Sequence, residues 1–105
     1  MAGSTPFDAV EWIARTEDVA VRVNALGPGQ ATPWHHHTVV TDNVFALDPG
    51  IEVALRAPDE AFPLPPGARR EIPPGRIHRV SNRSDRPARY LLVQATGRYD
   101  FVEAP

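Results

Sequence analysis

The chain has 105 residues, enough for one domain with a buried core, and a formal net charge of −2. All 11 basic residues are arginine, and this charge balance does not indicate a nucleic-acid-binding protein. The absence of cysteine excludes disulfides and thiolate metal sites, and no apolar run is long enough to span a membrane. The N-terminus has no charged and apolar leader, so we expect a cytoplasmic protein with a single domain, residues 1–105.

The arginines are concentrated in the second half of the chain, where nine of the eleven lie from Arg56 onward. The simplest interpretation is a compositional bias combined with a solvated surface. The alternative is an anion-binding face, because the guanidinium group suits carboxylates and phosphates. The candidate members of that face are Arg69, Arg70, Arg76 and Arg79.

Short stretches in which apolar and polar residues alternate predict β-strands along most of the chain. Residues 1–5 are expected to be loose. Within residues 18–26, Val21 and Val23 are expected on one face of the strand and Arg22 on the other. The predicted strands are residues 7–15, 18–26, 31–37, 42–47, 51–56, 61–64, 69–72, 77–81, 88–95 and 98–102.

Turn signals separate these strands. Gly27-Pro28-Gly29-Gln30 and Asp48-Pro49-Gly50 combine glycine, which accepts positive φ, with proline, which fixes φ beside it. No segment has helical periodicity of useful length, and turns recur about every eight to twelve residues, a spacing typical of all-β domains. The pattern therefore predicts a β-sandwich or β-barrel.

Three histidines and one aspartate form the main functional pattern. His35 and His37 are two residues apart, so on a strand they point to the same side, while His36 points to the other. Asp42 follows after a short gap, and His78 lies much further along the chain. If these side chains met in one place, three imidazoles and a carboxylate would suit a divalent metal. The alternative is a surface cluster of histidines with no metal.

The spacing of these residues resembles the two motifs of the cupin superfamily. The second cupin motif, G-x5-P-x-G-x2-H-x3-N, is matched at every fixed position by Gly67, Pro73, Gly75, His78 and Asn82. The first motif, G-x5-H-x-H-x3,4-E-x6-G, is matched by Gly29, His35 and His37, with Asp42 in place of the glutamate and Gly50 one residue late. The resemblance covers roughly residues 20–95, and it implies a barrel core over about residues 18–97.

The resemblance implies an all-β fold, a cupin-type jelly-roll β-barrel. It also implies that a metal is bound by His35, His37, Asp42 and His78. Counting back from Gly50 by the family spacing reaches Asn43, so Asn43 competes with Asp42 for the fourth ligand position. Asp42 is preferred because an anionic oxygen balances a divalent ion better than a neutral amide does. The ion would be Fe, Mn, Ni or Zn, and the ligand types do not choose among them.

Several further residues are candidates for binding the substrate. Gln94 is an amide in the middle of an apolar strand, so it must find a partner in backbone, water or substrate. Phe45 and Tyr90 are tentative candidates, although core packing is the more common role of aromatic side chains. Trp34 and Arg22 are considered for the same cavity.

The resemblance implies a metalloenzyme that acts on a small organic substrate, of the dioxygenase, cyclase or isomerase type. Four inward-facing polar groups are costly to bury without an ion, which favours this hypothesis. The alternative is a non-catalytic cupin that binds a small molecule. The resemblance also implies a homodimer, in which Tyr99 and Phe101 are expected to cover a barrel edge or a subunit contact.

Overall fold

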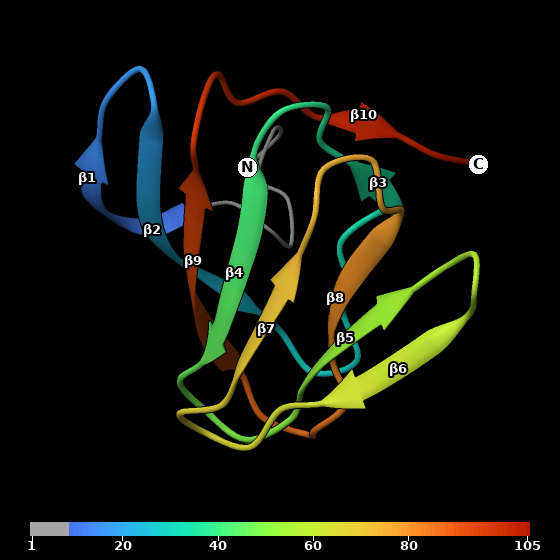
Figure 1. Ribbon diagram of the computed structural model, residues 1–105. Coiled ribbons are helices and arrows are strands. Elements are labelled where there is room, and N and C mark those ends of the chain that lie inside the picture. Colours follow the sequence, from blue (N-terminus) through green and yellow to red (C-terminus); the bar gives the residue numbers. More distant parts are fainter. Residues whose placement is uncertain (1–8) are drawn as a thin grey trace.

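The computed structural model describes residues 9–105, which form ten β-strands and no helix (Figure 1). Residues 1–5, and the first two residues of the strand predicted at 7–15, lie outside the described part. Within residues 9–105, therefore, no helix is long and apolar enough to cross a membrane. The strands are β1 (Ala9–Arg15), β2 (Val19–Leu26), β3 (His35–His36), β4 (Thr41–Ala46), β5 (Ile51–Leu55), β6 (Glu60–Pro63), β7 (Arg69–Ile72), β8 (His78–Asn82), β9 (Ala88–Ala95) and β10 (Val102–Glu103).

Each predicted strand has a counterpart, and two of them differ from the prediction in extent. The strand predicted at residues 31–37 pairs only at β3, preceded by an isolated bridge between Ala31 and Ser81. Pro33 lies between the two pairings and has no N–H to donate to a ladder. The strand predicted at residues 98–102 is reduced to β10, because the residues before it leave the sheet and cross the interior histidines.

The strands form two five-stranded antiparallel sheets, in the orders β1-β2-β9-β4-β7 and β10-β3-β8-β5-β6 (Figure 1). Successive strands from β2 onward often belong to different sheets, so the chain passes repeatedly from one sheet to the other, as in a jelly roll. The predicted all-β jelly roll is confirmed. The predicted barrel is not a closed one: between residues 9 and 105 no strand pairing joins the two sheets into a single ring.

Apolar side chains from both sheets fill one end of the interior. In the first sheet Leu26 is the register partner of Ala88, and Ala46 is the partner of Tyr90. From the second sheet Val53, itself paired with Val80, completes this core. These side chains are nearly all removed from solvent, and their burial is the main source of stability in such a domain.

Polar side chains fill the other end of the same strands. Gln94 on β9 is the register partner of Asp42 on β4, so the two side chains lie next to each other on the inner face. The alternation predicted for residues 18–26 is confirmed: Arg22 is 7% exposed and points inward, whereas Val21 is half-buried on the outer face. The strand pattern thus brings an amide, a carboxylate and a guanidinium into the interior.

Turns from the two motifs fix where this polar end lies. Gly75 has φ of +80°, a conformation that favours glycine, and its N–H donates to the carbonyl of His37 at 2.7 Å. Asn82 accepts a hydrogen bond from the Ser84 N–H at 2.9 Å, so its side chain stabilises the turn that follows β8. Gly50, at φ +107°, lies so close to Asn82 that a Cβ would be 2.6 Å from its Oδ1.

Candidate metal centre

Four side chains from three strands and one loop meet at the polar end of the interior. His35 on β3 and His78 on β8 are register partners across the second sheet. Asp42 on β4 reaches them from the first sheet, and His37 lies directly after β3. All four are between 1% and 5% exposed, and each offers one ligand atom within 4.8 Å of the other three. This is the set of residues that the sequence predicted to come together.

The two residues next to these ligands point elsewhere. His36 lies between His35 and His37 on the opposite side of the chain and is only half-buried. Asn43 lies on the outer face of β4, where its Oδ1 accepts a hydrogen bond from Nη1 of Arg69 at 2.6 Å. Asp42, and not Asn43, is therefore the residue that lies with the three histidines in the interior.

Backbone carbonyls orient all three imidazoles. Nδ1 of His35 lies 2.7 Å from the carbonyl of Pro33, and Nδ1 of His78 lies 2.7 Å from the carbonyl of Arg76. Nδ1 of His37 is bonded in the same way to the carbonyl of Asp100. A carbonyl only accepts, so Nδ1 carries the hydrogen in each ring. Nε2 is then the nitrogen left for the cluster, an arrangement common among metal-binding histidines.

A positive charge is needed where the Nε2 atoms meet the carboxylate. Oδ2 of Asp42 lies 3.0 Å from Nε2 of His37 and 3.0 Å from Nε2 of His78. With Nδ1 already protonated, each Nε2 presents a lone pair to an anionic oxygen unless a proton or a metal ion lies between them. A divalent ion would satisfy all of these donors together, so the residues fit a metal site.

The contacts within the cluster also shift the pKa values of Asp42, His37 and His35. Burial acts to raise the pKa of Asp42, but its hydrogen bonds to His37 and His78 outweigh that effect and lower the pKa below its ordinary value. Burial acts to lower the pKa of His37, but the hydrogen bond to Asp42, the charge of Asp42 and the contacts with Asp100 together outweigh burial and raise the pKa. Burial and the nearby His78 lower the pKa of His35 to about 4, so this ring is neutral and available as a ligand near neutral pH.

Gln94 holds the carboxylate from its other side. Its Nε2 donates to Oδ1 of Asp42 at 2.9 Å, and its Oε1 accepts from Nη1 of Arg22 at 2.8 Å. Oδ1 is thereby occupied, and Oδ2 is the oxygen that faces the imidazoles. Gln94, which the sequence predicted to need a hydrogen-bond partner, is therefore bonded to the carboxylate of Asp42. Arg22 belongs to the same chain of hydrogen bonds.

The other predicted cavity residues separate into two groups. Tyr90 and Gln94 line a cavity of about 20 Å³ beside the cluster, and burial raises the pKa of Tyr90 to about 12. Phe45 lies on the outer face of β4, opposite Asp42, so it does not line the cavity. Trp34 lies outside as well, with the guanidinium carbons of Arg56 and Arg79 at 4.1 and 4.7 Å from its ring centre.

The arginines proposed as an anion-binding face do not converge on one site. Arg69 and Arg70 are consecutive on β7, so their side chains point to opposite faces. Arg76 donates to Glu60 at 3.0 Å, and Arg79 lies over Trp34. Each is engaged with its own neighbour, which favours the interpretation as solvated surface.

The segment before β10, expected at a barrel edge or a subunit contact, lies over the histidines. The ring of Phe101 stacks on His35 with centroids 4.4 Å apart, and Tyr99 lies 5.3 Å from His37. Asp100 anchors the segment by accepting the Thr38 N–H at 2.8 Å, in addition to the Thr38 hydroxyl. No motif indicated this contact, because it depends on the path of the chain after β9.

Comparisons with known proteins agree with this architecture. The family model described as "Cupin domain" matches residues 23–94, a stretch that contains all four residues of the cluster. No curated protein matches the sequence.

Among solved structures, the chain is similar to an uncharacterized conserved protein with a double-stranded β-helix domain from Klebsiella pneumoniae, with a TM-score of 0.75 and 23% identity over 89% of this chain and 75% of that one. It is also similar to a recombinant oxalate oxidase in complex with glycolate, with a TM-score of 0.75 and 17% identity over 82% of this chain and 46% of that one. A sugar phosphate isomerase of the cupin superfamily from Silicibacter pomeroyi gives a TM-score of 0.66 and 18% identity over 82% of this chain and 68% of that one. At these identities the likeness concerns the fold alone, and the chain spans less than half of the oxalate oxidase.

Proposed function

This chain belongs to the cupin family, and on that premise we propose that it is a metal-dependent enzyme that acts on a small organic substrate by a dioxygenase, cyclase or isomerase type of reaction. A divalent ion at the cluster would supply Lewis-acid chemistry or activate oxygen or water. The residues of the chain would bind this ion, orient its ligands and keep bulk water away from it.

The observation that carries the proposal is the common orientation of the three imidazoles. Each gives its Nδ1 hydrogen to a backbone carbonyl, and two Nε2 atoms lie 3.0 Å from one carboxylate oxygen of Asp42. A structural histidine in a core needs a partner for each nitrogen. It does not need two further imidazoles and a carboxylate at the same point, and burying such a group without a cation would be costly.

The ligand types restrict the identity of the metal but do not determine it. Imidazole and carboxylate ligands suit Fe, Mn, Ni and Zn, while the absence of cysteine argues against metals that need thiolate. Three histidines and one carboxylate would leave positions open for a substrate on an octahedral ion such as Fe(II), Mn(II) or Ni(II). The same four ligands would complete a tetrahedral zinc site.

A small-molecule substrate is supported by the space beside the cluster. A cavity of about 630 Å³ adjoins it, within the roughly 300–1,000 Å³ usual for ligand sites. Arg22, Gln94 and Tyr99 line both this cavity and the small one at the cluster. Phe101 and Tyr99 cover the histidines, and their rings would limit the access of water.

Metal analysis of the purified full-length protein tests the site. We expect about one equivalent of metal per chain, and we expect His37→Ala to lose it because the variant lacks one imidazole ligand. His36→Ala is the matched control, since this neighbouring ring points away from the cluster, and it should keep its metal. Unchanged metal content in His37→Ala would refute the assignment.

Turnover is a separate test. Protein loaded with Fe, Mn, Ni or Zn would be assayed for oxygen consumption and product formation with catechols, thiols and diketones. A loaded protein that binds such compounds and converts none of them would indicate the non-catalytic binding function instead. The expected homodimer and cytoplasmic location stay predictions, to be checked by light scattering and by cell fractionation.

A further inference from the structure

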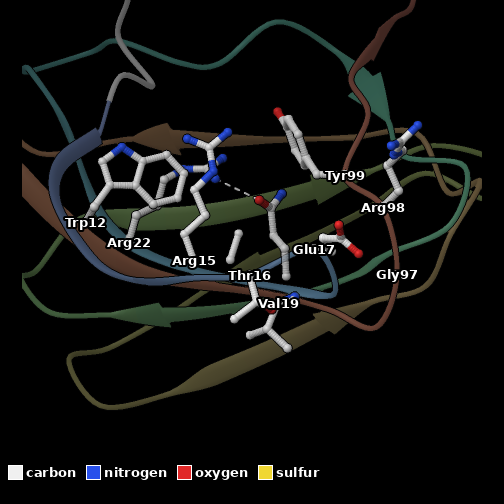
Figure 2. A pocket seen from close by; sticks show the side chains of 11 residues that line it. Trp12, Arg15, Thr16, Glu17, Val19, Arg22, Gly97, Arg98 and Tyr99 are labelled. Carbon is white, nitrogen blue, oxygen red and sulfur yellow. Dashed lines mark hydrogen bonds between the residues drawn. The ribbon is translucent and has the colours of Figure 1, made fainter.

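Basic and aromatic side chains make up five of the eleven residues that line the larger cavity beside the cluster. It is formed by β1, the turn to β2, β2 itself and the segment after β9 (Figure 2). Three arginines, Arg15, Arg22 and Arg98, line it against a single acidic residue, Glu17. In Figure 2 Arg15 and Arg22 lie next to Trp12, and Tyr99 and Arg98 lie toward the other side. The cavity is therefore positively charged.

Arg22 is the buried member of these three arginines. It is 7% exposed, and three of its neighbours are neutral: Gln94 Oε1 lies 2.8 Å from its Nη1, and the ring centres of Trp12 and Tyr99 lie 5.1 and 5.4 Å from its guanidinium carbon. Among the side chains that the structure describes, no carboxylate forms a salt bridge with it. A buried guanidinium without an anionic partner is costly, and a bound anion would offset that cost.

Two cationic side chains, those of Arg15 and Arg22, lie near the ring of Trp12. The guanidinium carbon of Arg15 lies 4.7 Å from the Trp12 ring centre, and that of Arg22 lies 5.1 Å from it. Cation–π attraction stabilises each arginine, but the two like charges repel each other. One anion between them would remove this repulsion, and the planar fork of arginine matches a carboxylate.

We propose that this cavity binds a small organic carboxylate, with its carboxylate group paired to Arg22 and supported by Arg15, and with the rest of the molecule against the wall that Gln94 and Tyr99 share with the metal cluster. Of the three arginines of the cavity, Arg22 is buried, whereas Arg15 and Arg98 are exposed. A single buried cation matches the single negative charge of a carboxylate better than the higher charge of a phosphate ester. This inference rests on the proposed function, since it assigns a substrate class to the same site.

Binding of benzoate and its neutral analogue benzamide to the metal-loaded, full-length protein tests the proposal by calorimetry. We expect benzoate to bind roughly tenfold more tightly or better, as for a charge-assisted hydrogen bond. Arg22→Met should remove this preference, and at saturating metal it should still bind one equivalent, because Arg22 contacts Gln94 and is not among the residues of the cluster. Arg83→Met is the matched control, an exposed arginine paired with Glu52 on the other sheet, and it should bind benzoate like the parent protein.

Arg15→Met provides a second variant should Arg22→Met fail to fold, because Arg15 is exposed. It should weaken benzoate binding by about threefold and leave benzamide binding unchanged, as for a partly solvated ion pair. Equal affinity for benzoate and benzamide, unchanged benzoate binding in folded Arg22→Met, or a preference for phenyl phosphate would each overturn the carboxylate assignment. A parent protein that binds no metal would instead refute the proposed function. The failure of this inference and the failure of the proposed function are therefore distinguishable.

Discussion

The apolar end and the polar end of the interior are built from the same strands, but they differ in what satisfies their side chains. At one end β2, β4 and β9 contribute Leu26, Ala46 and Ala88 to an apolar core. At the other end the same three strands contribute Arg22, Asp42 and Gln94. Apolar burial stabilises the first end without any partner, whereas each polar group of the second end depends on a specific neighbour.

This difference separates the apolar part of the jelly roll from the part that could hold a metal ion. The apolar end releases water from side chains that need no hydrogen bonds, so it tolerates the absence of any ligand. The polar end contains the convergent imidazoles and Asp42, which are satisfied only by protons or by a cation. Stability should therefore depend on ligands at one end alone, and the following experiments test that separation.

The largest effect is expected in the apolar core. Leu26→Ala should lower the free energy of unfolding by roughly 2–5 kcal/mol, because Leu26 is 1% exposed and its truncation leaves a cavity. Chemical denaturation would measure this change. Leu47→Ala, the same substitution at a residue that is 38% exposed, is the control and should change stability by less than about 0.5 kcal/mol. Loss of metal from folded Leu26→Ala would show that the two ends are not separable.

Removal of metal should have the next largest effect, and it should act at the polar end. With metal at about a hundredfold excess over its Kd, binding stabilises the fold by roughly 2.7 kcal/mol, so a chelator should lower the Tm by roughly 10–20 °C. Asp42→Asn keeps the shape of the side chain and removes its charge, so its Tm should respond much less to the chelator. Equal chelator responses in the parent protein and in this variant would contradict a ligand role for Asp42.

The resemblance to the cupin motifs predicted the cluster, and local patterns support the positions of its members. His35 and His37 are related by the period of a strand, and Gly75 and Asn82 define the turns on either side of His78. The same period could have excluded Phe45, which is three residues from Asp42 and therefore lies on the opposite face of β4. For this reason Phe45 does not line the cavity beside the cluster.

The remaining parts of the site depend on tertiary structure. The bond between Gln94 and Asp42 follows from the register of β9 against β4, which no local pattern specifies. The position of Tyr99 and Phe101 over the histidines follows from the path of the chain after β9. The alternation places Arg22 on the polar side of β2, but it does not say which side of the strand faces the interior. Only the tertiary structure shows that the side with Arg22 is buried.

A smaller effect is expected for the residue that orients Asp42. Gln94→Leu removes the hydrogen bond to Oδ1 and should weaken metal affinity by about 10–100-fold, as for other groups that orient metal ligands. Titration with a competing chelator would measure the affinity, and saturating metal should still give one equivalent. Tyr90→Phe is the control, because the Tyr90 hydroxyl accepts from Asn24 and makes no hydrogen bond to the cluster. Equal affinities for both variants would show that Gln94 does not position the carboxylate.

The smallest effect is expected for Asn43, the immediate neighbour of Asp42 on the outer face of β4. Asn43→Ala removes an exposed hydrogen bond from Arg69, so it should cost less than about 1 kcal/mol of stability and leave the metal content unchanged. Metal analysis and chemical denaturation of this variant would measure both quantities. Counting back from Gly50 by the family spacing reaches Asn43, whereas the strand places Asp42 inside. Loss of metal in Asn43→Ala would mean that β4 is shifted by one residue, and it would move every inward-facing side chain of that strand to the other face.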